Sequence, residues 1–116
     1  MHWTEGAARA TPPQWAPARA GIAQAVVAHA YGVTLEDMSA DTRGAPRAAL
    51  ARQIAMYLAH IVFALSVRDV ARGFGRKHST CLHAIQRVEE LREDPDLDRT
   101  LHFLETMLRN AAGRAA

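Results

Sequence analysis

The chain has 116 residues, of which 49% are hydrophobic and 6% aromatic. This is enough for one modest core, so we expect a single domain and exclude a multidomain enzyme. Cys81 is the only cysteine, which excludes an intramolecular disulfide. The longest apolar stretch, residues 54–67, is interrupted by His60 and is shorter than the roughly 20 residues that span a bilayer. With no apolar run typical of a signal peptide at the amino terminus, we expect a cytoplasmic protein that does not contact a membrane.

The charge is unevenly distributed. The net charge is only +2, but residues 43–92 carry nine Arg or Lys against three acids, and both flanks are net acidic. A basic middle in a nearly neutral protein is typical of a phosphate-binding face. It is equally compatible with an ordinary solvated surface.

The composition favours helices. Ala, Leu, Arg and Glu are abundant, and Pro and Gly are sparse after residue 46, so we predict an all-α protein. Residues 1–17 contain three prolines and no sustained periodicity, which indicates a flexible tail in which Trp3 and Trp15 could dock on the domain or on a partner. The predicted domain is residues 18–110, and we expect residues 111–116 to fray.

The first half of the domain contains two predicted helices and a short turn. Apolar residues recur at helical spacing over 18–31, and Gly32 follows where a helix cap favours a left-handed residue. Thr34 can cap a single helical turn. Pro46 suits the first turn of a long central helix, which we predict to extend to about Leu65.

The second half contains three more predicted helices. Ser66 and Asp69 have the spacing of a capping box that opens a short helix to about Phe74. The next helix is predicted from about His78 to Arg92, with one apolar face that includes Cys81, and Asp94 followed by Pro95 indicates the start of a final helix. The prediction is therefore a compact bundle of about five to six helices.

Residues 66–92 fit a helix-turn-helix, because two helices are joined by a tight turn containing glycine. In this motif the amino terminus of the second helix enters the major groove of DNA, where backbone amides favour phosphate and short polar side chains reach the bases. Residues 76–80, Arg-Lys-His-Ser-Thr, supply those groups.

Two separated motifs resemble a known family. The first reads Arg-Gln-Ile-Ala-Met-Tyr-Leu at residues 52–58, and the second reads Phe-Gly-Arg-Lys-His-Ser-Thr-Cys-Leu-His-Ala at residues 74–84, with Ser66 between them. They resemble the C-terminal DNA-binding domain of the bacterial chromosomal replication initiator DnaA, which typically reads R-Q-x-A-M-Y-L, then S-L-x-x-I, then F-G-G-R-D-H-S/T-T-V-x-H-A. The resemblance covers roughly residues 18–109 and implies a TrpR-like helical fold.

The resemblance also implies roles for particular residues. By matching position, His78, Ser79, Thr80 and Leu82 meet bases or phosphates in the major groove, with Leu82 against a thymine methyl group.

Outside the second helix, the resemblance implies that Arg52 and Gln53 hold the DNA backbone. It further implies that a basic loop before the central helix inserts an arginine into the minor groove, for which Arg43 and Arg47 are the candidates.

The departures from the family pattern affect the expected specificity. The chain is one residue shorter between Phe74 and His78, and Lys77 stands where the family has aspartate. Aspartate can accept a hydrogen bond from cytosine, whereas lysine donates to guanine or to phosphate, so the preferred site can differ from the initiator's. The sequence has no G-x-x-x-x-G-K-S/T motif, so we expect no bound nucleotide and a stand-alone version of the domain.

Two alternative functions are disfavoured. His78 and His83 are five residues apart and therefore off a common helical face, and no paired cysteines occur, so we expect no metal and no other cofactor. Cys81 is predicted to be buried, and buried cysteines are usually inert, so we do not expect an enzyme. A protein-interaction module on the same scaffold, with base reading weakened or lost, stays open as the main alternative.

The sequence therefore predicts sequence-preferring binding of double-stranded DNA, in the regulation of transcription or of replication initiation, by a protein associated with the nucleoid. The predicted DNA-binding residues are Arg43, Arg47, Arg52, Gln53, Ser66, Arg76, Lys77, His78, Ser79, Thr80, Leu82, His83 and Arg87.

Overall fold

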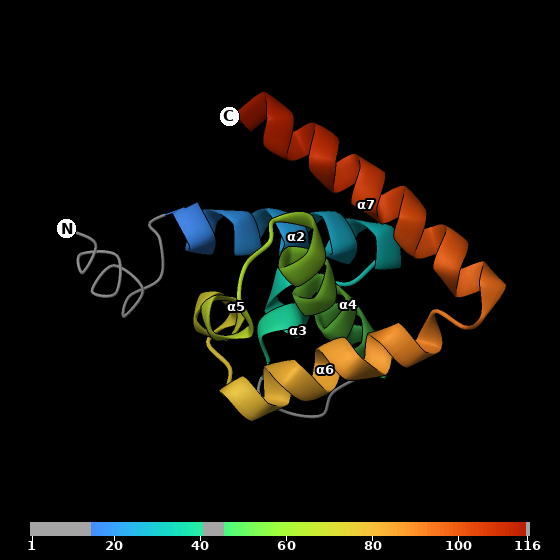
Figure 1. Cartoon of the computed structure of the whole chain (residues 1–116), viewed down its shortest axis with the longest axis horizontal. Helices are drawn as coiled ribbons and strands as arrows, with labels where there is room; N and C mark the ends of the chain where they lie inside the picture. Colours follow the sequence, from blue (N-terminus) through green and yellow to red (C-terminus); the bar gives the residue numbers. More distant parts are fainter. Residues whose placement is uncertain (1–14, 41–45, 116) are drawn as a thin grey trace.

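The computed structural model describes residues 15–40 and 46–115, and these residues form six α-helices (Figure 1). The helices are α2 at Trp15–Tyr31, α3 at Leu35–Ser39, α4 at Pro46–Val62, α5 at Val67–Phe74, α6 at His78–Leu91 and α7 at Pro95–Ala115. No strand occurs in the described residues, and the predicted all-α bundle is confirmed. Of the predicted tail, residues 1–17, positions 1–14 lie outside the described residues.

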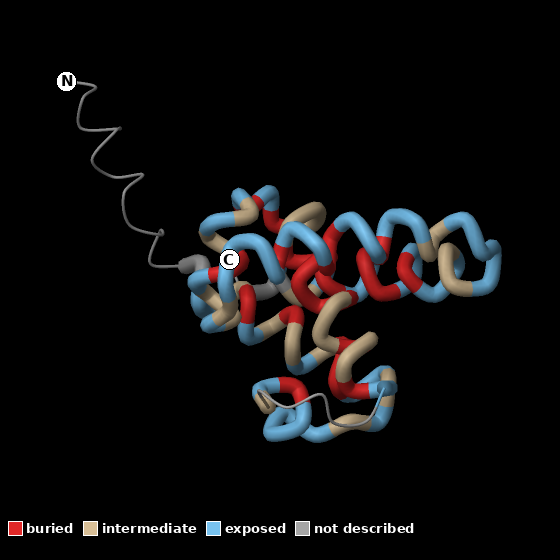
Figure 2. The backbone as a smooth tube through the Cα atoms, turned by 90° about the horizontal axis from the view of Figure 1, so that it is seen from below, coloured by how far each residue is buried: buried red, intermediate tan, exposed pale blue. Residues whose placement is uncertain are grey.

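Helix α4 occupies the centre of the bundle. It packs against all the other helices, and eight of its residues are buried, including Ile54, Tyr57 and Leu58. Small side chains let α4 and α2 approach each other closely. The fully buried alanines are Ala51 and Ala55 on α4 and Ala23 on α2. Buried positions lie toward the middle of the molecule, and the outward turns of the helices are exposed (Figure 2).

Local sequence signals set most helix ends. The Thr34 hydroxyl accepts a hydrogen bond from the Asp37 amide at 3.0 Å and caps α3, and the Ser66 hydroxyl accepts from the Asp69 amide at 3.1 Å and caps α5. Gly32 has a φ of 65°, in the left-handed region that glycine adopts without strain. These predicted caps are confirmed.

The structure changes several predicted boundaries. Helix α4 ends at Val62 rather than near Leu65, because Ala64 adopts a left-handed φ of 55° and the His60 Nδ1 donates to the Leu65 carbonyl at 2.7 Å. At the two ends of the chain, α2 begins at Trp15, before the predicted start at residue 18, and α7 continues to Ala115.

The turn between α5 and α6 depends on Gly75. Its φ is 65°, its amide donates to the Arg72 carbonyl at 3.2 Å, and the Arg76 amide donates to the Ala71 carbonyl at 2.9 Å. This pair of bonds is a Schellman motif, in which a left-handed residue ends the helix. The chain therefore leaves α5 and enters α6 within three residues.

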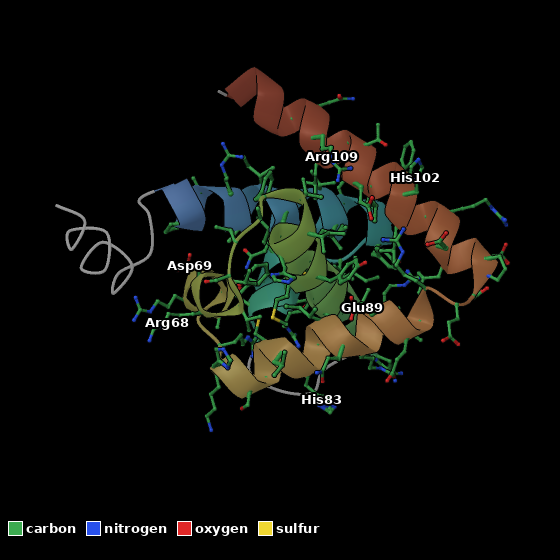
Figure 3. All side chains as sticks on the ribbon, in the orientation of Figure 1. Arg68, Asp69, His83, Glu89, His102 and Arg109 are labelled. Atoms are coloured by element: carbon green, nitrogen blue, oxygen red, sulfur yellow. The ribbon has the colours of Figure 1, made fainter. Side chains whose placement is uncertain are left out.

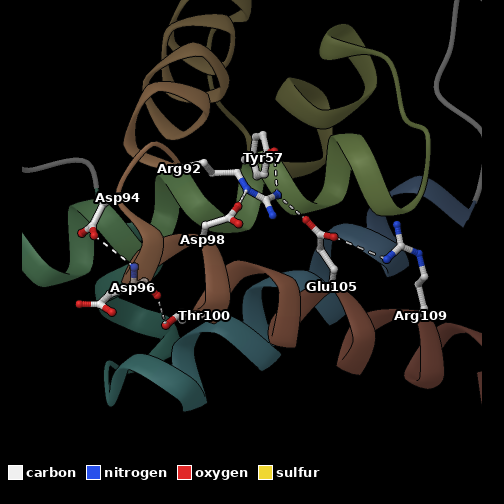
Figure 4. Close-up of polar contacts among 8 residues, drawn as sticks. All are labelled: Tyr57, Arg92, Asp94, Asp96, Asp98, Thr100, Glu105 and Arg109. Atoms are coloured by element: carbon white, nitrogen blue, oxygen red, sulfur yellow. Dashed lines mark hydrogen bonds and ion pairs between the residues drawn. The ribbon is translucent and has the colours of Figure 1, made fainter.

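Arg92 joins α6, α4 and α7 (Figure 4). Its guanidinium donates to Asp98 at 2.6 Å, to Glu105 at 2.5 Å and to the Tyr57 hydroxyl at 3.0 Å. Burial lowers the pKa of Arg92, but the hydrogen bonds to Glu105 and Asp98 outweigh this effect and raise it. Although Arg92 was counted in the basic middle of the sequence, its charge is neutralised by α7 rather than presented to a ligand.

The left-handed conformation of Gly75 predicts opposite effects of alanine at two glycines. A Cβ at Gly75 would meet no atom within 4 Å, so Gly75→Ala carries only the backbone strain and should lower the free energy of unfolding by about 1–2 kcal/mol. Gly21→Ala, in an exposed position of α2 with equal space, should raise it by about 0.5–1 kcal/mol. Urea unfolding of both variants checks this, and equal signs would contradict it.

The Arg92 network predicts a larger loss of stability than a surface ion pair. Arg92→Met leaves Glu105, which is only 8% exposed, without its closest partner and should cost about 2–3 kcal/mol. Arg99→Met removes the exposed pair with Asp96 and should cost less than about 0.5 kcal/mol. Thermal unfolding of the two variants compares them; similar losses would refute a structural role for the network.

Candidate nucleic-acid interface

Helices α5 and α6 and the turn between them form a helix-turn-helix. Helix α5 packs against α6, and both pack on α4, so the core fixes their relative orientation. Ser66 begins the unit as the cap of α5, and Gly75 sets the turn. The helix-turn-helix predicted over residues 66–92 is therefore present.

Helix α6 has one buried and one exposed face. The buried residues are Cys81, Ala84, Ile85 and Val88. The exposed residues of its first turns are His78, Ser79, Thr80, Leu82, His83, Gln86 and Arg87. Leu82 keeps 38% of its surface exposed, and His83 points away from the body of the protein (Figure 3). All the α6 residues predicted to contact DNA therefore lie on the exposed side.

The charge of α6 is polarised along its axis. Its first turn contains no acid, whereas Glu89 and Glu90 lie in its last turn. Lys77 is the residue before the helix, with the extended backbone of an N-cap (φ −70°, ψ 149°) and no side-chain capping bond. The amide dipoles add positive potential at this end. The amino-terminal half of α6 is thus the part that favours an anion.

A surface pocket of about 260 Å³ lies between α4 and the start of α6. Its polar lining comes from five predicted site residues, with Met56 and Ala84 completing the wall; the five are Arg52, Gln53, Arg76, Thr80 and His83. The first and last of these positions, Arg52 and His83, are 31 positions apart in the sequence. The fold therefore joins the two sequence motifs into one surface.

Two of the lining arginines also hold helix α3. The Arg52 guanidinium donates to the Met38 carbonyl at 2.7 Å and to the Asp37 carbonyl at 3.0 Å. Arg76 donates to the Ala40 carbonyl at 2.8 Å. Sequence reasoning missed this arrangement, because no local pattern connects Arg52 or Arg76 to α3.

The remaining predicted residues lie apart from the pocket. Arg47 is exposed in the first turn of α4, and Ser66 is exposed at the opposite end of α5 from the turn. Arg87 is exposed on α6, two turns from its beginning. Arg43 lies outside the described residues.

A metal ion or a reactive thiol needs a particular geometry among the histidines, the acids and Cys81. Residues 15–40 and 46–115 contain no group of three or more His, Cys, Asp or Glu that could hold a metal ion. Cys81 is fully buried, and desolvation raises the pKa of its thiol to about 11, which keeps the thiol protonated and unreactive. Over the same described ranges, no helix has the length and apolar character needed to cross a membrane.

The chain is similar to chromosomal replication initiator proteins. The chain is 43% identical over 89 residues to the chromosomal replication initiator protein DnaA of Rickettsia africae (strain ESF-5), covering 75% of this chain and 19% of the initiator. The initiator of Rickettsia canadensis (strain McKiel) is 42% identical over the same length. The chain therefore spans about a fifth of the length of these relatives.

Two solved structures have the same fold. A crystal structure of a DNA replication initiation factor superposes with a TM-score of 0.75 at 35% identity, over 83% of this chain and 30% of the other. A replication initiator DnaA bound to AMPPCP and single-stranded DNA gives a TM-score of 0.72 at 34% identity, over 82% of this chain and 29% of the other.

The family comparison agrees with the fold. The family model described as the bacterial DnaA protein helix-turn-helix matches residues 22–88, which is more than half of the chain and includes α4, α5 and most of α6. The chain thus belongs to the bacterial DnaA helix-turn-helix family.

Proposed function

We propose that this chain binds double-stranded DNA with a sequence preference and acts in the regulation of replication initiation or of transcription. The observation that carries the proposal is the exposed, acid-free start of α6 beside a polar pocket. A helix of this kind, supported from behind by a packed helix, fits the major groove of DNA.

The proposal divides the surface into two kinds of contact. Thr80, Leu82 and Lys77, with His78 and Ser79, supply base reading at the start of α6, because short side chains there stand on a rigid helix. The phosphate contacts come from cationic and polar side chains at its edges. The proposed phosphate-binding residues are Arg47, Gln53, Ser66, His83 and Arg87, and Arg43 stays a candidate for the minor groove. Arg52 and Arg76 line the pocket, but their guanidinium groups donate to carbonyls at the end of α3.

A protein-interaction module is the second candidate function. The specific observation in its favour is Lys77, which replaces the acid of the family pattern at the start of the reading helix. The two functions differ in one measurement, whether the purified chain shifts a DNA duplex at physiological salt.

The proposed function predicts a steep dependence of affinity on salt. Selection from a random pool should yield a preferred duplex, and each phosphate contact should add about 0.9 to the slope of log affinity against log salt concentration. Arg87→Met should lower that slope by about 0.9, whereas Arg99→Met on α7 should leave it unchanged.

Fluorescence titration at several salt concentrations measures these slopes. A single-stranded probe of the same sequence is the control, because one similar initiator structure contains single-stranded DNA. Failure to shift any duplex, or equal affinity for both probes, would refute the proposal.

Lys77→Asp should change stability and specificity together. The backbone at Lys77 already has N-cap geometry, so an aspartate there can accept from the free amides of α6 and should stabilise the fold by about 1 kcal/mol. The same change removes a donor to guanine or phosphate and adds an acceptor for cytosine, so selection should recover a different preferred duplex.

Lys77→Ala separates the two effects, because alanine removes the donor without adding a cap. Thermal unfolding and repeated selection are the two measurements. An unchanged sequence preference in Lys77→Asp would remove Lys77 from the base-reading residues.

A further inference from the structure

Helix α3 is held at its carboxyl end by two arginines from other parts of the fold. Its carbonyls at Asp37 and Met38 accept from Arg52 on α4, and the carbonyl of Ala40, just beyond it, accepts from Arg76 in the helix-turn-helix turn. Arg76 also reaches the Met38 carbonyl at 3.5 Å. We infer that Arg76 and Arg52 are positioning residues for DNA binding, an inference that rests on the proposed function. They hold α3 in a fixed position relative to the proposed reading helix, α6, rather than serving chiefly as phosphate contacts.

Helix α3 needs such a tether because it has little stability of its own. It contains five residues, and Met38 is its only buried side chain. A helix this short gains too few internal hydrogen bonds to offset the loss of backbone freedom. The Asp37 carbonyl accepts only a long bond from the Ala40 amide, at 3.4 Å, and the carbonyls that follow it cannot be satisfied within so short a helix, so they require donors from elsewhere.

Arginine suits this position better than any other side chain. A guanidinium presents five N–H donors in a rigid plane and can donate to two carbonyls at once, as Arg52 does with Met38 and Asp37. Its positive charge also interacts favourably with the negative end of the α3 dipole. Lysine has one compact ammonium and cannot reproduce the planar fork.

The direction of the Arg76 side chain is set by the turn. Its backbone amide is fixed by the bond to the Ala71 carbonyl at 2.9 Å, directly after the left-handed Gly75. From this fixed backbone the side chain reaches α3, across 36 residues of sequence. The position of the α5–α6 turn therefore fixes the position of the end of α3.

The consequence for DNA binding is geometric. Arg47 lies in the exposed first turn of α4, the next described helix after α3, and α6 carries the proposed base-reading residues. The arginine tether fixes the α3 edge of the protein relative to α6. DNA contacts on either side of the pocket are then made without ordering α3 at the moment of binding, which would reduce affinity.

The test separates a positioning arginine from a phosphate-binding one. Arg76→Lys keeps the charge but loses the fork, and Arg76→Met loses both. Arg87→Lys and Arg87→Met are the matched controls, because Arg87 is exposed on α6 and makes no hydrogen bond or ion pair with other described residues. The probe is the duplex recovered by selection, titrated at several salt concentrations.

If Arg76 is a positioning residue, Arg76→Lys and Arg76→Met should both weaken DNA binding by about tenfold, because each loses one or two charge-assisted hydrogen bonds to α3. The slope of log affinity against log salt concentration should stay that of the unmodified protein, called the parent below. Arg87→Met, at a proposed phosphate contact, should lose about 0.9 of the slope, and Arg87→Lys, which keeps the charge, should keep the slope of the unmodified protein. In the free protein, amide hydrogen exchange of α3 should increase in both Arg76 variants and stay at the parent's rate in both Arg87 variants.

Other results would overturn the inference. Near-parent binding by Arg76→Lys together with a lowered slope in Arg76→Met would make Arg76 a phosphate contact, and unchanged exchange of α3 would remove the tether. If Arg76→Met does not fold, Arg76→Lys and Arg52→Lys give the same comparison. If the unmodified protein shifts no duplex, the proposed function is refuted. If the unmodified protein binds and Arg76→Lys binds equally well, only the positioning role of Arg76 is refuted.

Discussion

The packing of α6 on α4 is the constraint on which the interface depends. Cys81, Ala84, Ile85 and Val88 are the buried residues of α6, and α4, on which α6 packs, also packs against α2. Because protein interiors are closely packed, this contact fixes both the position and the rotation of α6. The exposed residues of its first two turns then share one surface without any loop having to order them. A site on a rigid helix holds short side chains in fixed positions more precisely than a site on a loop.

The arginines of this chain carry equal charge but have different structural roles. Arg92 is enclosed by Asp98, Glu105 and Tyr57 and stabilises the junction of α6 with α7. Arg52 and Arg76 bond to the carbonyl end of α3. Arg87 is exposed on α6. The basic middle of the sequence therefore overstates the charge available to a ligand, since part of it neutralises acids and helix ends within the fold.

The start of α6 lacks the stabilisation that a capping side chain would give. An acid at the N-cap would stabilise the helix, but Lys77 occupies this position and forms no capping bond. Residues that violate a local rule in this way are expected at binding sites. The buried Cys81 on the opposite face of α6 contributes packing rather than thiol chemistry, because burial raises the pKa of its thiol and keeps it protonated.

The sequence by itself determined the secondary structure and the two faces of α6. Apolar spacing, the caps at Thr34 and Ser66, and the glycines at 32 and 75 act within a few residues, so their effects can be read locally. The motifs at 52–58 and 74–84 also indicated the family. The end of α4 was misplaced, because the left-handed Ala64 and the His60 bond to Leu65 leave no periodic signal.

Only the tertiary structure decided which residues act together. Gln53 and Thr80 line one pocket, although they lie on different helices. Arg52 and Arg76 donate to carbonyls at the end of α3. Arg92 pairs with acids of α7 and is therefore not part of a basic surface. The physical reason is that a hydrogen bond between residues 14 to 38 positions apart depends on how helices pack, and helix packing is set by the complementary shapes of buried faces rather than by any local pattern.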